Sequence, residues 1–341
     1  MGPYTRPVNT KQQQCQEEVA QMNSIIREIQ TIYDDNTPLF TKDAIRKVGD
    51  ELDVFQKGAS KGREIILKGI NGADYKVFVA PPSPNLSNNQ HHGGSTWIIF
   101  YHSIESLTVR RDILSFLPQT AYLPMEIAAC TREIDFDPEY EDKSPVSSTE
   151  DLCRAFQDVE QKLRASEYQE RLQVALNTLN VPFVLDKIVA LALGPLILGP
   201  QVCDSGMIQH ALASVLHSSL LQRGILSVTS KRYVQDPAYT QKDRDVLRPE
   251  GFTILDDPQA FLVLDESSII VSINPDIPVK QIVADICRPG IIIWDKGKNL
   301  HLCADPASSR VVKMIENEYY EVEFPYHKLF GDLVMYIRKF A

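Results

Sequence analysis

Residues 186–206 read DKIVALALGPLILGPQVCDSG, which is an apolar run, then glycines and prolines, then the start of a helical pattern. A buried strand that ends in a glycine turn before a helix is typical of nucleotide-binding α/β domains. In those domains, backbone N–H groups of the turn and of the helix N-terminus bind phosphate. Here Pro195 has no N–H, and Ala192 adds a Cβ where phosphate needs close backbone approach. The stretch therefore predicts the frame of a nucleotide site, with a stiff, apolar loop suited to an apolar ligand.

Downstream of this stretch, runs rich in Ile, Val and Leu alternate with helical patterns. Near-continuous apolar strands separated by helices indicate a mostly parallel sheet covered on both faces. We expect a Rossmann-like, doubly wound α/β domain. The predicted strands are 187–193, 226–235, 252–255, 268–273 and 290–295; the predicted helices are 205–222, 241–249, 258–262 and 279–286, with closing helices at 306–318 and 326–339.

The N-terminal part has a different pattern. Helical spacing predicts helices over 12–34 and 41–55, and Asn71-Gly72 predicts a tight turn in a following hairpin. The Pro-, Asn- and Gly-rich loop 81–95 is the expected boundary, so the predicted domains are an N-terminal module, 1–95, and the Rossmann-like domain, 96–341. That domain would open with a buried strand at 96–103 and a helix to about 117. The segment from Ser148 is one long helix or two short ones.

The composition limits the class of protein and its partners. The hydrophobic fraction of 43% and charged fraction of 23% are ordinary for a globular protein. A net charge of -10 argues against nucleic acid or an anionic membrane as partner, and the longest apolar run, 188–200, is too short to span a bilayer. Six cysteines without a C-x-x-C pair favour a reducing compartment, cytosolic or nuclear, and no structural zinc. An apolar face on the first helix would also serve a homodimer.

Ligands of open α/β sheets bind at the carboxyl ends of the strands, which selects the candidate site residues. Asp236 would act as a general base or as an acceptor for a ligand hydroxyl; its alternative role is to cap a turn. His210 and His217 are seven residues apart on one helix, too far for one metal ion, so no metal is expected. The predicted catalytic residues are Asp236, Tyr239 and His210; the predicted substrate-binding residues are Gly194, Pro195, Leu196, Leu198, Gln235, Asn274, Tyr101, His102 and Glu105.

Each of these residues also has a purely structural interpretation. Asn274 would form a turn, His210 would be packed in the core, and the LILGP segment would be buried packing. The sequence has no G-x-S-x-G elbow, no Walker loop, no H-E-x-x-H and no kinase signature. Serine-triad hydrolysis, phosphoryl transfer and zinc proteolysis are therefore disfavoured.

Four segments carry a family resemblance: KIVALALGPL, QHALASVL, VQDPAYTQKDRDVLRPEGFTILDDPQAF and SIIVSINPDIPVKQIVADICRPGIIIWD. Together they resemble the Sensitivity To Red Light Reduced family in its fungal form, over roughly residues 148–296. The resemblance implies a Rossmann-like fold and regulatory phenotypes, in plant light and clock signalling and in yeast haem metabolism, without an agreed chemical activity. The family usually has a G-x-G-type turn where this chain has Ala192-Leu193-Gly194-Pro195, so nucleotide binding at this turn is in doubt.

Three functions remain open. The first is a cofactor-independent biosynthetic enzyme, a cyclase, pericyclase or isomerase, that folds an apolar natural product in the crevice. Asp236 and Tyr239 would then face the same cavity as Leu196 and Leu198. The second is a non-enzymatic regulatory protein whose acidic surface meets a protein partner. The third is a nucleotide- or tetrapyrrole-linked binding protein.

Overall fold

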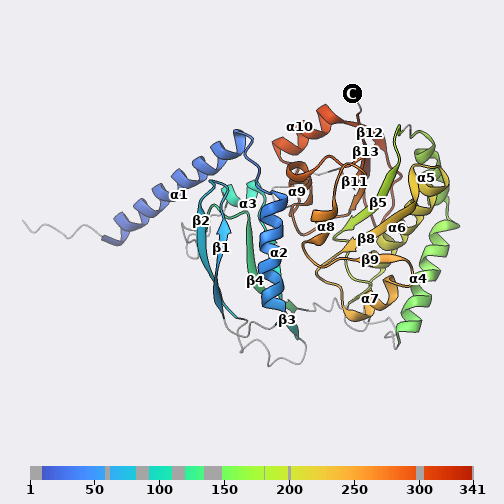
Figure 1. Cartoon of the computed structure of the whole chain (residues 1–341), viewed down its shortest axis with the longest axis horizontal. Coiled ribbons are helices and arrows are strands. Elements are labelled where there is room, and N and C mark those ends of the chain that lie inside the picture. Colours follow the sequence, from blue (N-terminus) through green and yellow to red (C-terminus); the bar gives the residue numbers. More distant parts are fainter. Residues whose placement is uncertain are drawn as a thin grey trace, which may run out of the picture.

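The computed structural model describes residues 10–57, 62–81, 92–109, 120–133, 148–179, 181–198, 201–296 and 303–339. Figure 1 shows two adjoining parts: an N-terminal unit, from α1 to β4, and a sheet domain, from α4 to β13. The chain therefore passes from one part to the other between β4 and α4, within residues 134–147, which lie outside the described part.

The sheet domain contains a seven-stranded sheet in the order β12-β13-β11-β10-β5-β8-β9. Five neighbouring strands, from β11 to β9, are parallel, and β5 lies in the centre with β8 and β10 beside it. The predicted doubly wound, mostly parallel sheet is confirmed. Its strands are β5 (Leu185–Leu191), β8 (Leu226–Gln235), β9 (Phe252–Ile254), β10 (Ser268–Ser272), β11 (Ile291–Asp295), β12 (Tyr319–Glu323) and β13 (Leu333–Arg338).

The last predicted helix, 326–339, is wrong. Its second half is β13, which pairs antiparallel with β11 on one side and with β12 on the other. Gly331, with φ of +70°, sits in the turn before β13 and would interrupt a helix. The segment LVMYIR is buried on nearly every residue, because it continues the sheet rather than covering it.

Helices cover both faces of the sheet, as the alternation along the strands requires. Ile188 and Ala190 of β5 pack on the first face of the sheet, and Val189 and Leu191 pack on the other face. The segment from Ser148 forms two short helices, not one long one. The first face carries α4 (Thr149–Arg164), α5 (Glu167–Asn177), α6 (Asp204–Gln222) and α7 (Gln241–Leu247); the other carries α8 (Gln259–Val263), α9 (Val279–Ile286) and α10 (Ser309–Glu318); a small hairpin, β6 (Ile197–Leu198) and β7 (Gln201–Val202), precedes α6.

The N-terminal unit contains two further two-stranded sheets. The predicted strand 96–103 begins earlier, as β3, and pairs with β4 instead of joining the large sheet. The predicted turn at Asn71-Gly72 lies in a five-residue loop, where the Asn71 side chain accepts the N–H of Ala73. The elements are α1 (Thr10–Asp34), α2 (Lys42–Gln56), β1 (Arg63–Lys68), β2 (Asp74–Val79), β3 (His92–Tyr101), α3 (Ile104–Val109) and β4 (Met125–Glu133). Residues 82–91 of the predicted boundary loop and 110–117 of the predicted helix lie outside the described residues.

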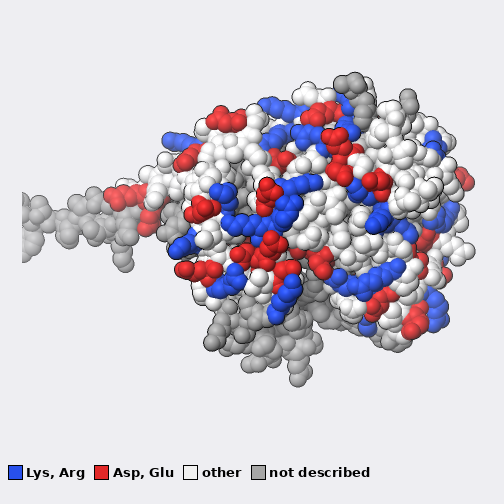
Figure 2. Space-filling view, viewed as in Figure 1, with Lys and Arg blue, Asp and Glu red and all other residues white. Residues whose placement is uncertain are grey.

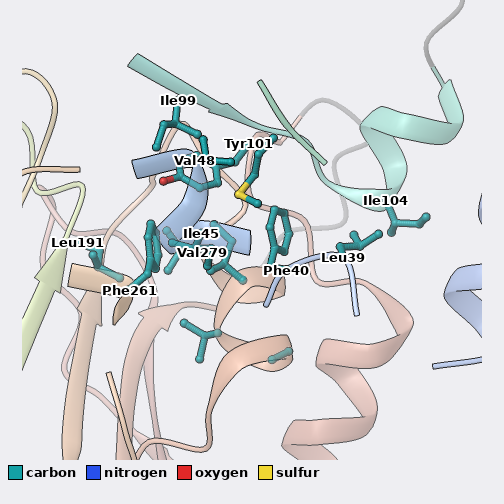
Figure 3. Packing of buried hydrophobic residues seen from close by; sticks show 14 of the residues in the cluster. Leu39, Phe40, Ile45, Val48, Ile99, Tyr101, Ile104, Leu191, Phe261 and Val279 are labelled. Atoms are coloured by element: carbon teal, nitrogen blue, oxygen red, sulfur yellow. The ribbon is translucent and has the colours of Figure 1, made fainter. Parts of the chain in front are cut away.

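One hydrophobic cluster joins the N-terminal unit to the sheet domain. Phe40 and Ile45 of the N-terminal unit lie near Phe261 of α8 and Val279 of α9, and Leu191 of β5 belongs to the same cluster (Figure 3). Because this core is shared, the two parts are expected to fold together.

A buried ion pair fixes the way in which the two parts meet. Arg310 of α10 pairs with Asp285 of α9 and also donates to the carbonyl oxygens of Tyr33 and Thr37. Asp285 in turn accepts the backbone N–H groups of Leu39 and Phe40, at 2.7 and 3.1 Å. These directed contacts set the orientation that the apolar cluster alone would leave open.

The shared core predicts the effect of Phe40→Ala. Phe40 is 0% exposed, so the variant should lose about 3–5 kcal/mol of unfolding free energy, with both parts still unfolding in one transition. Phe78→Ala is the matched control, because Phe78 is 63% exposed and its loss should cost less than about 1 kcal/mol. Urea denaturation followed by fluorescence and circular dichroism measures both; two separated transitions in the wild type would contradict a shared core.

Candidate functional site

The loop after β5 has the backbone shape of a glycine turn. Ala192 and Gly194 both adopt positive φ, of 55° and 74°. For a residue with a Cβ this conformation costs about 1–2 kcal/mol, so Ala192 is held in place by its surroundings. One such contact is the hydrogen bond from the Ala192 N–H to the carbonyl oxygen of Gln235, at 3.0 Å. The loop thus keeps the path of the turn although the residue is not glycine.

The N–H groups of this loop are used by carboxylates of the chain itself. Gly194 donates to Asp236 Oδ2 and Leu196 donates to Asp243 Oδ1, each at 2.7 Å. Pro195, between them, has no N–H. Two side-chain carboxylates therefore stand where a phosphate-binding loop would hold the ligand's anion.

The start of α6 is also covered by the loop. A Cβ on Gly206 would lie 1.9 Å from the carbonyl oxygen of Pro195, so only glycine permits this approach. The N–H of Cys203 donates to the carbonyl oxygen of Leu196, at 2.9 Å. The backbone of the loop packs directly on the helix N-terminus, the second place where a phosphate would bind.

His210 and Tyr239, two of the predicted catalytic residues, meet in the protein interior. His210 Nε2 lies 2.6 Å from the hydroxyl of Tyr239, and its Nδ1 lies 2.7 Å from the carbonyl oxygen of Gly206. Because a carbonyl oxygen only accepts, Nδ1 carries the proton and Nε2 accepts from Tyr239. Burial lowers the pKa of His210 to about 4 and raises the pKa of Tyr239 well above its usual value. This pair is a neutral core contact.

The predicted common cavity is not formed by the residues expected to line it. Leu196 is 0% exposed, whereas Leu198 is 52% exposed on the β6–β7 hairpin. Asp236 accepts the N–H groups of Gly194 and Ala238, which is the turn-capping role left open by the sequence.

A different polar group lies on the same edge of the sheet. Asp257, in the loop after β9, is partly buried, and its Oδ1 accepts from Tyr101 Oη at 2.8 Å and from Gln235 Nε2 at 3.0 Å. Gln235 is itself fixed, since its Oε1 accepts the N–H of Ala260 at 2.7 Å. Two predicted substrate-binding residues, Tyr101 and Gln235, thus converge on a carboxyl group that the sequence analysis did not select.

The environment of Asp257 changes its protonation. Burial raises its pKa to about 7, and the nearby charge of Asp236 acts in the same direction. The hydrogen bonds from Tyr101 and Gln235 favour the charged form and lower the pKa, but they do not outweigh burial. A carboxyl group with this pKa exchanges a proton near neutral pH, and such groups cluster at functional sites.

The other predicted residues lie apart from Asp257. Glu105 accepts from Gln281 Nε2 at 2.6 Å, and His102 Nε2 lies 3.6 Å from Glu126. Asn274 is exposed in a left-handed turn after β10, with φ of 47°. Of the predicted group Tyr101, His102 and Glu105, Tyr101 is therefore the member that contacts Asp257.

Asp257 has a weak sequence signal. It follows the predicted strand 252–255 in the segment LDDPQA, so the rule that ligands bind at the carboxyl ends of strands applies to it. The same rule applies equally to Asp256, which is exposed and pairs with Arg244. Only the folded structure separates the two aspartates, because Tyr101 lies 156 residues upstream.

Metal and cleft geometry do not add another candidate at this edge. Among the described residues, no group of three or more His, Cys, Asp or Glu side chains could hold a metal ion. A cleft of about 340 Å³ lies at the opposite edge, near the amino ends of β10 and β11. It is lined by Lys42, Asp265, Glu266, Asp285, Ile286, Cys287 and Arg288.

Within the described chain, no helix combines the length and apolar character needed to cross a bilayer.

The fold and its closed glycine-type loop define a Rossmann-like α/β protein. The SRR1 domain model matches residues 160–337, just over half of the chain. The chain belongs to the SRR1 domain family, which confirms the family predicted from the sequence. A comparison with curated proteins found no match.

Two solved structures are similar to the chain in part. Cofactor-bound Rv0187 from MTB is 12% identical, with a TM-score of 0.29, covering 57% of this chain and 90% of its own. A protein from Methanococcus maripaludis, proposed to be an S-adenosyl-L-methionine-dependent methyltransferase, is 11% identical, with a TM-score of 0.26, covering 58% and 98%. At these identities the likeness concerns the fold alone.

The closed loop predicts that Asp243→Asn destabilises the protein. Asp243 Oδ1 accepts from Leu196, and Oδ2 accepts from the N–H and hydroxyl of Thr240, so an amide would turn one donor toward another. We expect a loss of about 1–3 kcal/mol in urea denaturation. Asp245→Asn, on the exposed side of the same helix, is the control and should change stability by less than about 0.5 kcal/mol. Equal stability of the two variants would show that the loop does not depend on Asp243.

The raised pKa of Asp257 predicts a pH-dependent contribution to stability. Because the folded pKa lies above the unfolded one, protonated Asp257 stabilises the fold at pH 4, and this contribution is lost as pH rises to about 7. Relative to Asp257→Asn, the wild type should lose on the order of 1–3 kcal/mol between pH 4 and pH 7.5. Asp305, whose pKa burial also raises to about 7, is common to both proteins and cancels. Parallel stability curves for the two proteins would contradict the assignment.

Proposed function

We propose that the chain is a cofactor-independent enzyme of the cyclase, pericyclase or isomerase type, acting on an apolar small molecule at the carboxyl edge of its sheet. The observation that carries the proposal is Asp257, a carboxyl group with a pKa of about 7, held by Tyr101 and Gln235. Asp257 takes the role of proton-transfer group that the sequence analysis gave to Asp236.

The chemistry of the edge favours a ligand without phosphate. The loop N–H groups of Gly194 and Leu196 already bind carboxylates of the chain. An incoming phosphate would have to displace these contacts and would meet the charge of Asp236. Ala192 and Pro195, in the same loop, are partly exposed and apolar. These features support an uncharged, largely apolar ligand.

The proposed reaction needs only proton transfer and orientation. Near neutral pH, Asp257 is present in both protonation states, so it would accept a proton from one position of the ligand and return it to another. Tyr101 and Gln235 both donate to Oδ1 and thereby fix the carboxyl plane. No redox or group-transfer partner is required for such an isomerisation, because atoms and charge balance within the ligand.

The surface supports a small-molecule ligand over nucleic acid. The net charge is -10, and Figure 2 shows basic and acidic side chains interspersed on the face in view. The four described free thiols, at Cys153, Cys203, Cys287 and Cys303, support the proposed cytosolic or nuclear location.

A non-enzymatic regulatory protein is the second candidate. It is favoured by the internal use of Asp236, Asp243, His210 and Tyr239, which ties the predicted catalytic groups into the core. In that function, the hydrogen bonds to Asp257 would only join the N-terminal unit to the sheet. The third reading, a nucleotide- or tetrapyrrole-linked binding protein, would need the loop contacts to open.

A thermal-shift screen with three panels tests these functions: nucleotides and S-adenosyl compounds, haem precursors, and terpenoid or polyketide extracts. We expect only the apolar third panel to raise the melting temperature, by a few degrees at ligand concentrations about 100 times Kd. For a ligand that is converted, Asp257→Asn should lower turnover about a hundredfold or more, because it removes the proton acceptor. Asp256→Asn, at the exposed neighbour, is the matched control and should keep turnover.

Each other outcome selects a different function. Stabilisation by nucleotides, abolished in a loop variant, would contradict the proposal and favour the third reading. Stabilisation by haem precursors would do the same. No shift with any panel would favour the regulatory protein.

A further inference from the structure

Tyr101 belongs to the N-terminal unit but reaches the edge of the sheet domain. It is the last residue of β3 and lies outside the matched SRR1 domain, residues 160–337. Its ring packs near Phe40 of the N-terminal unit and Phe261 of α8, with centroid distances of 6.3 and 5.6 Å (Figure 3). Tyr101 is buried in this packing, at 8% exposed, which limits the rotation of its ring.

The hydroxyl group of this ring donates to Asp257 Oδ1, at 2.8 Å. The same oxygen accepts from Gln235 of β8. One side-chain donor thus comes from the N-terminal unit, which also supplies the backbone hydrogen bond of Ile99, and the other side-chain donor comes from the sheet domain. The carboxyl group of Asp257 is held by both parts of the molecule at once.

The docking of the N-terminal unit determines where this hydroxyl lies. Close to Tyr101, the N–H of Ile104 donates to Gln281 Oε1 of α9 at 3.0 Å, and Gln281 Nε2 donates to Glu105. Gln281 is buried, so both hydrogen bonds are shielded from water. The end of β3 is therefore fixed relative to the sheet domain independently of the Tyr101 hydroxyl.

We propose that Tyr101 is a positioning residue that orients the Asp257 carboxyl group, and that the N-terminal unit is therefore part of the functional unit. The inference rests on the proposed function, which assigns proton transfer to Asp257. Its consequence is that residues 160–337 alone lack the Tyr101 donor, together with the backbone donor of Ile99, and keep Gln235.

The test is a carbon-13 NMR titration of the Asp257 carboxyl group in the full chain. Tyr101→Phe keeps the ring and its packing but removes the donor. Because this hydrogen bond favours the charged form, its loss should raise the pKa of Asp257. Tyr122→Phe is the matched control: its hydroxyl donates to Glu28 at 2.5 Å within the N-terminal unit, so the Asp257 titration should stay at the wild-type midpoint.

An unchanged Asp257 midpoint in folded Tyr101→Phe would overturn the inference, even if the variant were less stable. If that variant does not fold, the wild type still decides: the Tyr101 ring carbon that bears the hydroxyl should titrate together with Asp257, and an independent titration would overturn the inference. Failure of the proposed function would be distinct, because a ligand screen without a hit leaves the titration results standing. If a ligand that the enzyme converts is found, the pH profile of kcat should shift to higher pH in Tyr101→Phe.

Discussion

The requirement that buried backbone N–H groups find acceptors governs the carboxyl edge of this sheet. The turn after β5 presents the N–H groups of Gly194 and Leu196, whose acceptors are side-chain carboxylates and not backbone carbonyl groups. Asp236 and Asp243 supply them from the next β–α connection. A nucleotide-binding domain leaves such donors for its ligand, whereas here the fold uses them itself. The position of α7, capped through Asp243, and the close contact at Gly206 follow from this closure.

Because this loop is closed, the proposed proton transfer is assigned to the loop after β9 and not to the loop after β8. Asp236 and Asp257 follow neighbouring strands. Asp236 accepts the backbone N–H groups of Gly194 and Ala238, whereas Asp257 accepts from the side chains of Tyr101 and Gln235 in addition to the backbone of Ile99. Backbone donors are fixed by the fold, so a carboxylate bound to them acts mainly as a structural element. Side-chain donors such as Tyr101 can be contributed by another unit, and the site they form depends on how that unit docks.

Much of the fold follows from local patterns, while the site depends on distant partners. The parallel strands are apolar runs of the right length, and α4 begins at Ser148, whose side chain accepts the N–H of Asp151. The sequence predicts a helix over segment 333–338, whereas the structure has a strand there. The pairing with β11 that makes it a strand is a tertiary contact, which the local pattern does not show. Asp236 was placed correctly at the edge, but its partner Gly194 is 42 residues away. No local pattern could show that the carboxylate caps the loop.

Distant partners also separate Tyr101 from His102 and Glu105, the two residues predicted to act with it. His102 and Glu105 follow it directly and share its sequence context, but β3 ends at Tyr101 and the chain turns toward α9. Only the side chain of the last strand residue points at Asp257, while Glu105 contacts Gln281 of α9. The boundary of β3 therefore separates a residue of the site from residues of the docking contact. The end of β3 at Tyr101 is set by its pairing with Met125, the first residue of β4. Residues so far apart in the sequence are not related by the local hydrophobic periodicity, so the sequence pattern could not predict this strand end.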